Sequence, residues 1–401
     1  MSLNIDRLVA ADRFIEERYL EPGILPGFSW SVVHDGEVVH TNNAHYDPDA
    51  IFRIYSMTKP ITSVAMLMLI ERGLCRLADP ISKWLPEWAD MNVYTGGSVM
   101  SMATSGADRT ITIQDLFTHS SGLTYGWMFT HPVDAAYRKR GIGLRTKTLA
   151  ETCSLLADVP LMFSPGTRWQ YSLSTDVLGH LVELISGKPL DEFFSAEIFV
   201  PLGMTDTSFW VDDDNASRLV PNTAIPSQSP FGVPPGAESF GPGELVIIDD
   251  NRPTGEYRSK PAMLSGGGGL ASTLSDYTTF CQMVLNGGEL NGTRLLGSRT
   301  VAFAGQNHLP GGATLADIGE PIASETDNEG VGFGLGFSVA IDPAQNRVIQ
   351  SPGTMAWGGA ASTLFWIDPV EKLAVIGMTQ VMPSWCTNLR DELRQIVYGA
   401  L

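Results

Sequence analysis

The tetrapeptide Ser56-Met57-Thr58-Lys59 brings a serine and a lysine to a spacing that could support nucleophilic catalysis. At the start of a helix, residues three apart lie on one face, within reach of each other. A neutral lysine can accept the serine proton, and the helix N-terminus stabilises the negative charge that then develops on oxygen. Lys59 is the only one of the seven lysines with a serine three residues before it. Because about half of such sequences would contain one match by chance, the tetrad alone is a weak signal.

The residues that follow the tetrad strengthen the hypothesis. We expect a helix over 58–72 that ends at Gly73, in the position after a helix where glycine is common. Its stretch 64–70 is entirely apolar, which indicates a buried helix, and burial disfavours the charged form of an amine, as a lysine base requires. The alternative nucleophile motif G-x-S-x-G is absent from the sequence. Segment 336–340 is a near miss whose alternating pattern indicates a strand.

Two later segments could contribute to the same chemistry. Tyr171-Ser172-Leu173 follows a turn at 164–167, and Trp357-Gly358-Gly359-Ala360 precedes an expected strand over 361–367. A tyrosine in such a position is more often a half-buried aromatic residue than a catalytic one. Paired glycines allow the backbone to approach a ligand closely, but they also form ordinary turns. The residues alone leave both alternatives open.

Taken together, the three motifs resemble those of the serine β-lactamases and penicillin-binding proteins. The serine–lysine tetrad, a tyrosine 115 residues after Ser56 and a late glycine pair occur in the order typical of that family. Within it the chain is most similar to the class C β-lactamases and their esterase relatives, the family VIII carboxylesterases, from about residue 28 to 398. Further matching stretches are 52–60 (FRIYSMTKP), 116–123 (LFTHSSGL), 201–207 (PLGMTDT) and 266–273 (GGGGLAST).

The resemblance implies a role for each residue of the catalytic motifs. Ser56 would attack the substrate carbonyl, and Lys59 and Tyr171 would act as a coupled pair of bases that titrates as a unit. Backbone N–H groups of Ser56 and Ala360 would form the oxyanion hole. His119 is a candidate general base because it lies among serines, but the resemblance implies that it is a structural loop residue.

A substrate pocket follows from the same resemblance. We expect Trp357, Gly358 and Gly359 to line it, together with Tyr125 and Trp127 from the loop after 120–123. β-Lactamases carry Lys-Thr-Gly at the third motif and Tyr-x-Asn at the second. Here Trp-Gly-Gly and Leu173 replace them, and both departures favour the esterase branch.

The elements expected to position these residues lie at both ends of the chain. We expect an amphipathic helix over 3–19, strands over 28–34 and 37–41 joined at Asp35–Gly36, and a helix over 385–397. Further strands are expected over 333–341, 347–350, 361–367 and 373–378. This pattern predicts an α/β (α+β) fold, with an antiparallel sheet flanked by terminal helices and an inserted helical lobe. The resemblance implies that this fold is β-lactamase/transpeptidase-like. One catalytic module would then comprise an α/β lobe (1–55 with 300–401) and a mainly helical lobe (56–299), with the active site at their junction.

Composition narrows the class of protein. The 401 residues carry a formal net charge of −18, which argues against nucleic-acid or anionic-membrane binding. The four cysteines are far apart and the seven histidines show no ligand spacing, so we expect no metal and no cofactor. The longest apolar run, 64–70, is too short to span a bilayer. The amino terminus lacks signal-peptide features, so a cytoplasmic location with buried free thiols is expected.

The sequence therefore predicts a serine carboxylesterase that hydrolyses short-chain acyl esters through a Ser56 acyl-enzyme. A β-lactamase or D-alanyl peptidase shares every step and remains an alternative. An acyltransferase of the same fold would pass the acyl group to an alcohol other than water. A non-catalytic binding member is disfavoured by the intact set Ser56, Lys59 and Tyr171. The expected partner is a small-molecule ester, and the sequence leaves the oligomeric state and the natural substrate open.

Overall fold

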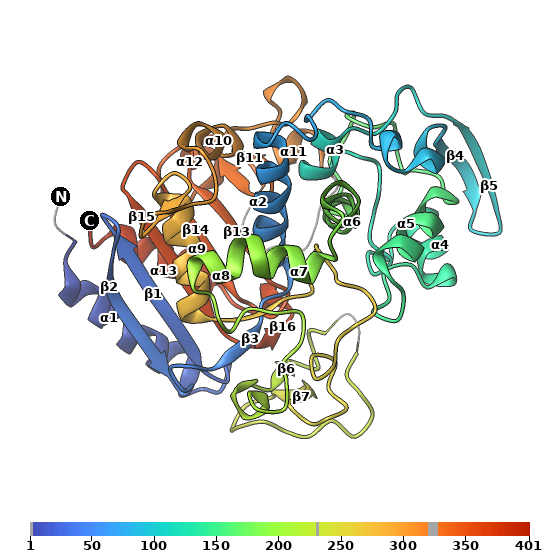
Figure 1. Cartoon of the computed structure of the whole chain (residues 1–401). Helices are drawn as coiled ribbons and strands as arrows, with labels where there is room; N and C mark the ends of the chain where they lie inside the picture. The colour runs from blue at the N-terminus through green and yellow to red at the C-terminus, as the bar shows by residue number, and fades with distance from the viewer. Residues whose placement is uncertain (1–2, 230–231, 320–327) are drawn as a thin grey trace.

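A seven-stranded antiparallel sheet forms the frame of the computed structural model, which describes residues 3–229, 232–319 and 328–401 (Figure 1). Its strands are β1 (Phe28–His34), β2 (Glu37–Ala44), β11 (Val331–Phe333), β12 (Ser338–Ala340), β13 (Met355–Gly358), β14 (Leu364–Asp368) and β15 (Leu373–Met378). They lie in the order β11-β12-β13-β14-β15-β1-β2, so the two ends of the chain meet where β15 pairs with β1. The expected strands at 28–34 and 373–378 and the Asp35–Gly36 hairpin are confirmed.

The two faces of the sheet bury different sets of helices, as the alternation of side chains along a strand requires. Trp366 and Val375 pack with the terminal helices α1 (Ile5–Ile15) and α13 (Leu389–Tyr398). Their neighbours Phe365 and Ile376 point to the opposite face, which packs against α9 (Leu274–Leu285) and the rest of the main core. Strands β14 and β15 are therefore buried on both faces, which explains why they appear in the sequence as nearly continuous apolar runs.

Several predicted element boundaries are wrong. The expected strand at 347–350 does not form: Asp342 caps a short helix, α12 (Pro343–Asn346), and Arg347 then adopts a left-handed conformation with φ of 58°. The expected strand 333–341 is a hairpin, because the chain turns between β11 and β12 at Gly336, whose φ is 97°. The last helix begins at Leu389 instead of residue 385.

The third motif also lies differently from the prediction. Trp357 and Gly358 do not precede a strand; they are the last residues of β13, a four-residue strand that the sequence analysis missed. Residues 359–363 then turn, with Ser362 at a φ of 66°, and β14 begins at Leu364 instead of residue 361.

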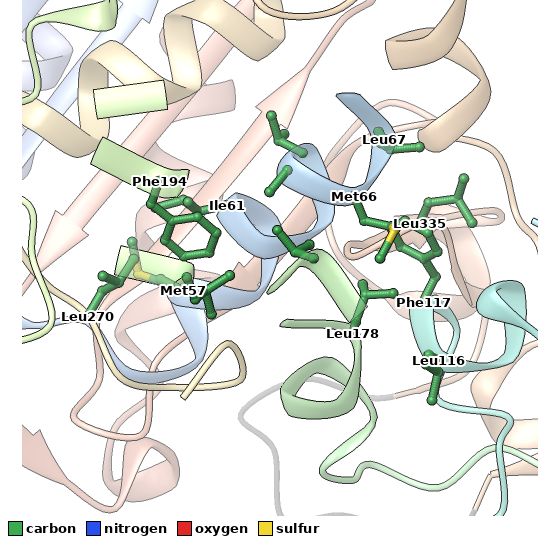
Figure 2. Close-up of a cluster of buried hydrophobic side chains, with 14 of the residues drawn as sticks. Met57, Ile61, Met66, Leu67, Leu116, Phe117, Leu178, Phe194, Leu270 and Leu335 are labelled. Carbon is green, nitrogen blue, oxygen red and sulfur yellow. The ribbon is translucent and has the colours of Figure 1, made fainter. Parts of the chain in front are cut away.

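A central buried helix, α2 (Thr58–Glu71), joins the sheet to the helical part of the chain (Figure 1). It packs against α6 (Ser174–Ser186), and its residues from Thr58 to Leu69 are all buried. Figure 2 shows the apolar side chains that surround it, namely Leu116 and Phe117 of α3 (Ile113–Phe117), Leu178 of α6, Phe194 of α7 (Leu190–Phe194), Leu270 and Leu335. The prediction of a buried helix behind the tetrad is confirmed.

The remaining elements surround this frame. They are α4 (Pro132–Arg140), α5 (Leu149–Ala157), α8 (Val200–Leu202), α10 (Ser298–Ala304), α11 (Leu315–Ile318), β3 (Ile51–Arg53), β4 (Asn92–Ser98), β5 (Ser101–Gly106), β6 (Asn222–Ala224), β7 (Val246–Asp249), β8 (Ala271–Thr273), β9 (Glu289–Leu290), β10 (Thr293–Arg294) and β16 (Val381–Met382). Within the described ranges, no helix combines the length and apolar character needed to cross a membrane. The mixed α/β fold with an antiparallel sheet agrees with the predicted fold class, while the boundaries of the two lobes stay a prediction.

Candidate active site

Ser56 lies in a sharp turn between strand β3 and helix α2. The turn begins at Tyr55, a non-glycine residue with a φ of 42°, and continues as one 3₁₀ turn over Tyr55–Met57. A left-handed tyrosine costs about 1–3 kcal/mol and needs support from its surroundings. Met57 supplies that support, because its side chain is fully buried and its carbonyl accepts a hydrogen bond of 2.9 Å from the Tyr277 hydroxyl of α9. The turn leaves Ser56 half-buried at the start of the helix.

The Ser56 hydroxyl has two polar neighbours. The Lys59 amine donates to Ser56 Oγ at 3.1 Å, and the Tyr171 hydroxyl donates to the same oxygen at 2.6 Å. Lys59 is only 1% exposed and also donates to the carbonyl of Gly267 at 2.6 Å. Its Nζ lies 4.5 Å from the centroid of the Tyr171 ring. A hydroxyl, an amine and a phenol thus share one small volume, where a proton can pass between them over hydrogen-bond distances.

The loop that carries His119 packs against Tyr171 and the residues on either side of it. His119 Nδ1 lies 3.1 Å from the Ser172 hydroxyl, its carbonyl accepts from Gln170 N, and its ring centroid is 5.0 Å from that of Tyr171. Burial, with the nearby positive charge of Lys59, keeps the pKa of His119 well below its ordinary value. A neutral imidazole that packs under Tyr171 and bonds to Ser172 is the arrangement expected of a structural loop residue.

The end of β13 closes the site on its other side. The indole N–H of Trp357 donates to the Tyr171 hydroxyl at 3.4 Å, and the two ring centroids are 5.4 Å apart. Gly359 lies directly against the Ser56 turn: a Cβ at this position would be 2.5 Å from the carbonyl oxygen of Ile54. Only glycine allows this approach, and it brings the next residue, Ala360, to the same turn. Within the described residues, the N–H of Ala360 donates to no backbone carbonyl.

Aromatic rings surround the hydroxyl of Tyr171. Tyr125 stacks on Trp127 with centroids 4.9 Å apart, and its own centroid is 5.2 Å from that of Tyr171. Trp127 lies 6.4 Å from Tyr171 by the same measure and is 42% exposed, so it forms the outer part of this group. Burial raises the pKa of Tyr125 well above its ordinary value, and neighbouring Tyr171 and Asp176 act in the same direction. Tyr125 is therefore a neutral wall of the site.

The structure thus brings together the residues that the sequence analysis selected: Ser56, Lys59, Tyr171, Trp357, Tyr125 and Trp127 through direct contacts, Gly359 through its approach to Ile54, and Gly358 and Ala360 as its neighbours in the chain. Their chemical roles stay predictions. Sequence reasoning missed the function of the glycine run 266–269, whose Gly267 carbonyl binds Lys59. Four consecutive glycines are a signal for close backbone packing that could have drawn attention to it.

Sequence reasoning also missed Asp176, in the first turn of α6. Its carboxylate is buried and accepts hydrogen bonds from the Ser265 hydroxyl and from Gly267 N–H. Burial raises the pKa of the Asp176 carboxyl, while the Ser265 hydroxyl and the positive charge of Lys59 act in the opposite direction. No signal in the sequence around Asp176 pointed to it, because its partners lie about ninety residues later in the chain.

Comparison with known proteins agrees with this geometry. The family model "Beta-lactamase" matches residues 13–398. Esterase EstB of Burkholderia gladioli is 31% identical over 360 residues, which cover 88% of this chain and 83% of that protein. A protein of Penicillium citrinum named ML-236A carboxylate methylbutanoyltransferase is 35% identical over 365 residues, covering 88% and 81%. The solved structure of EstCE1, "a hydrolase with promiscuous acyltransferase activity", aligns with a TM-score of 0.79 at 24% identity, covering 98% of this chain and 99% of that one.

The chain belongs to the β-lactamase family. The prediction of a β-lactamase/transpeptidase-like fold is confirmed by the family match and by the structural alignment. The predicted resemblance to family VIII carboxylesterases is borne out by the esterase relative, and the chain is an enzyme of the serine-hydrolase type found in this family.

Proposed function

We propose that this member of the β-lactamase family hydrolyses small carboxylic esters through an acyl-enzyme on Ser56. The observation that carries the proposal is the contact of Ser56 Oγ with both Lys59 Nζ at 3.1 Å and the Tyr171 hydroxyl at 2.6 Å. A serine needs an adjacent base to become a nucleophile at neutral pH, and these two groups are within proton-transfer distance.

In the proposed mechanism, Ser56 Oγ attacks the ester carbonyl while its proton passes to the Lys59–Tyr171 pair. The carbonyl π electrons move to oxygen, and N–H groups of Ser56 and Ala360 stabilise the resulting oxyanion. The pair then returns the proton to the departing alcohol as the C–O bond breaks, leaving the acyl group on Ser56. Water repeats the sequence, with the same pair as base, and releases the acid. Because Lys59 and Tyr171 both contact Ser56, we treat them as one unit that holds one proton.

We further propose that the preferred substrates are short-chain, neutral esters. Support comes from the residues around Ser56: by the motif resemblance, Trp357 corresponds to the position at which β-lactamases carry a lysine, and Tyr125 and Trp127 add aromatic surface. An indole offers apolar area and a single N–H donor instead of a positive charge for a carboxylate. A charge-assisted contact to an anion contributes about 1.5–3 kcal/mol, so its absence disfavours anionic lactams. The relative that is named as an esterase supports esters as the substrate class.

Acyl transfer to an alcohol is the second candidate. One relative is named as a methylbutanoyltransferase, and one solved structure is described as a hydrolase with acyltransferase activity. Both reactions share the acyl-enzyme and differ only in whether water or another alcohol attacks it. Adding an alcohol acceptor during ester turnover and measuring the transfer product separates the two functions.

A cytoplasmic location is part of the proposal, supported by the buried, unbridged thiols of Cys75, Cys153 and Cys281.

A panel of nitrophenyl esters of increasing acyl length, with nitrocefin and benzylpenicillin, tests the proposal. We expect kcat/KM for the butyrate ester to exceed that for benzylpenicillin by orders of magnitude. Ser56→Ala should lower ester hydrolysis by about 10⁴ or more while the protein still folds. Hydrolysis of benzylpenicillin at a rate comparable to that of the butyrate ester would favour the β-lactamase alternative. The absence of ester hydrolysis and of labelling by a fluorophosphonate would favour a binding protein.

A further inference from the structure

The surroundings of Lys59 leave its charge without a direct ionic partner. Its amine donates to Ser56 Oγ and to the Gly267 carbonyl, and among the described residues no carboxylate lies within ion-pair distance of it. At 1% exposure, Lys59 also has almost no access to water. A buried charged amine needs compensation from nearby dipoles or charges.

Asp176 reaches Lys59 through a single glycine. Asp176 Oδ1 accepts from Gly267 N–H at 3.1 Å, and the carbonyl of the same Gly267 accepts from Lys59 Nζ at 2.6 Å. The residue must be glycine, because a Cβ on Gly267 would be 2.5 Å from Asp176 Oδ2. The hydroxyl of Ser265 donates to Asp176 Oδ1 as well, so the carboxylate holds two points of the loop 265–267. Asp176 therefore fixes the direction of the carbonyl that orients Lys59.

We propose that Asp176 is a positioning residue of the Ser56 site, which holds the glycine run 266–269 against Lys59 and stabilises the charged form of that amine during proton transfer. The inference rests on the proposed acyl-enzyme function. Asp176 touches neither Ser56 nor the expected substrate; it acts through Gly267 and through its charge. Its place in the first turn of α6, where the helix dipole favours a negative charge, allows an ionised carboxylate in a buried position.

The other titratable groups around this pair do not supply the charge. His119, from the loop after α3, is held neutral by burial and by the charge of Lys59. Burial keeps the pKa of Tyr125 and that of Cys153, on α5, well above their ordinary values, so both stay protonated. Tyr171 belongs to the catalytic pair itself. Asp176 is thus the group expected to respond when Lys59 becomes charged.

Asp176→Asn separates charge from geometry. Both hydrogen bonds to the carboxylate end on Oδ1, which an asparagine oxygen can replace, so the variant removes the charge and keeps the shape. Without the carboxylate, the protonated, positively charged form of the Lys59–Tyr171 pair is less favoured. The acid limb of the kcat/KM profile should therefore move to lower pH by about one unit. The plateau should fall about tenfold or more because the base is weaker, with little change in KM.

A matched control is available on α9. Asp276 is also buried, and burial raises its pKa; it likewise accepts from a threonine hydroxyl, that of Thr207, and from a backbone N–H, that of Asp206. The charged groups that act on Asp276 are Asp206 and Arg218, and Lys59 is not among them. Asp276→Asn should therefore reproduce any general cost of removing a buried carboxylate without moving the pH profile.

The experiment measures two rates against pH for the full chain: hydrolysis of p-nitrophenyl butyrate and covalent labelling by a fluorophosphonate. We expect the acid limbs of both to move in Asp176→Asn and neither to move in Asp276→Asn. Unchanged limbs in Asp176→Asn, or equal shifts in both variants, would overturn the inference. If Asp176→Asn does not fold, Ser265→Ala replaces it. This variant removes the hydroxyl that donates to Asp176 and so makes the ionised form of the carboxyl less favourable. A smaller shift in the same direction is expected, and no shift would again overturn the inference. Ser56→Ala serves as the reference, because activity that survives it would contradict the proposed function and not this inference alone.

Discussion

Gly359→Ala tests whether the close approach of β13 to the nucleophile turn is required for catalysis. A Cβ at this position would lie 2.5 Å from the Ile54 carbonyl oxygen and 2.2 Å from Thr363 Oγ1, whereas ordinary contacts begin near 3.4 Å. The Thr363 hydroxyl can rotate away, but the Ile54 carbonyl belongs to the backbone that leads into Ser56. The strand end must therefore retreat by most of an ångström, and it carries the N–H of Ala360 with it.

A displacement of about 1 Å at a reacting group costs about a hundredfold in rate, and loss of one oxyanion donor costs about 10²–10³ in kcat. We therefore expect Gly359→Ala to lower kcat for p-nitrophenyl butyrate by about a hundredfold, with a smaller change in KM. Forced overpacking should also lower the free energy of unfolding by about 1–3 kcal/mol, which urea titration measures. Gly106→Ala is the control, since a Cβ there meets nothing within 4 Å. A kcat for Gly359→Ala within threefold of wild type, in folded protein, would refute the assignment of the oxyanion site to this strand end.

Three further predictions follow from the same contacts. Lys59→Ala and Tyr171→Phe should each lower kcat by orders of magnitude, and the double variant should lose little more; a loss equal to the product of the two would contradict a coupled base. Trp357→Lys should raise kcat/KM for benzylpenicillin relative to the butyrate ester by roughly ten- to a hundredfold, and an unchanged ratio would show that this position does not set the preference. Ile61→Ala, at a fully buried position in the first turn of α2, should cost about 2–5 kcal/mol of unfolding free energy by urea titration; a loss below 1 kcal/mol would contradict close packing around the helix.

The catalytic contacts that the sequence analysis predicted are those with a local pattern. Ser56 and Lys59 are three residues apart at a helix start, so helix geometry alone brings them together. The contact of Tyr171 with Ser56 spans 115 residues and was predicted only through the resemblance to a known family. The buried character of α2 was evident from its continuous apolar run, because no polar side chain interrupts it.

The features that were missed depend on partners far away in the chain. β13 has only four residues, and it forms a strand by pairing with β12 and β14. Its local sequence pattern is therefore too short to identify a strand. The stretch 347–350 has strand-forming residues, but the cap by Asp342 starts a helical turn just before it. Asp176 gains its importance from the loop 265–267, which packs against it only in the folded chain. Tertiary contacts decide these cases, and a single sequence does not contain them explicitly.

The central claim is that Ser56 carries the acyl group during turnover. Rapid acid quenching during hydrolysis of p-nitrophenyl butyrate, followed by peptide mapping with mass spectrometry, tests it directly. The account predicts a butyryl adduct on the peptide that contains Ser56, which disappears as the substrate is consumed and never forms in Ser56→Ala. An adduct on a different residue, or hydrolysis that persists in Ser56→Ala at a rate within tenfold of wild type, would contradict it.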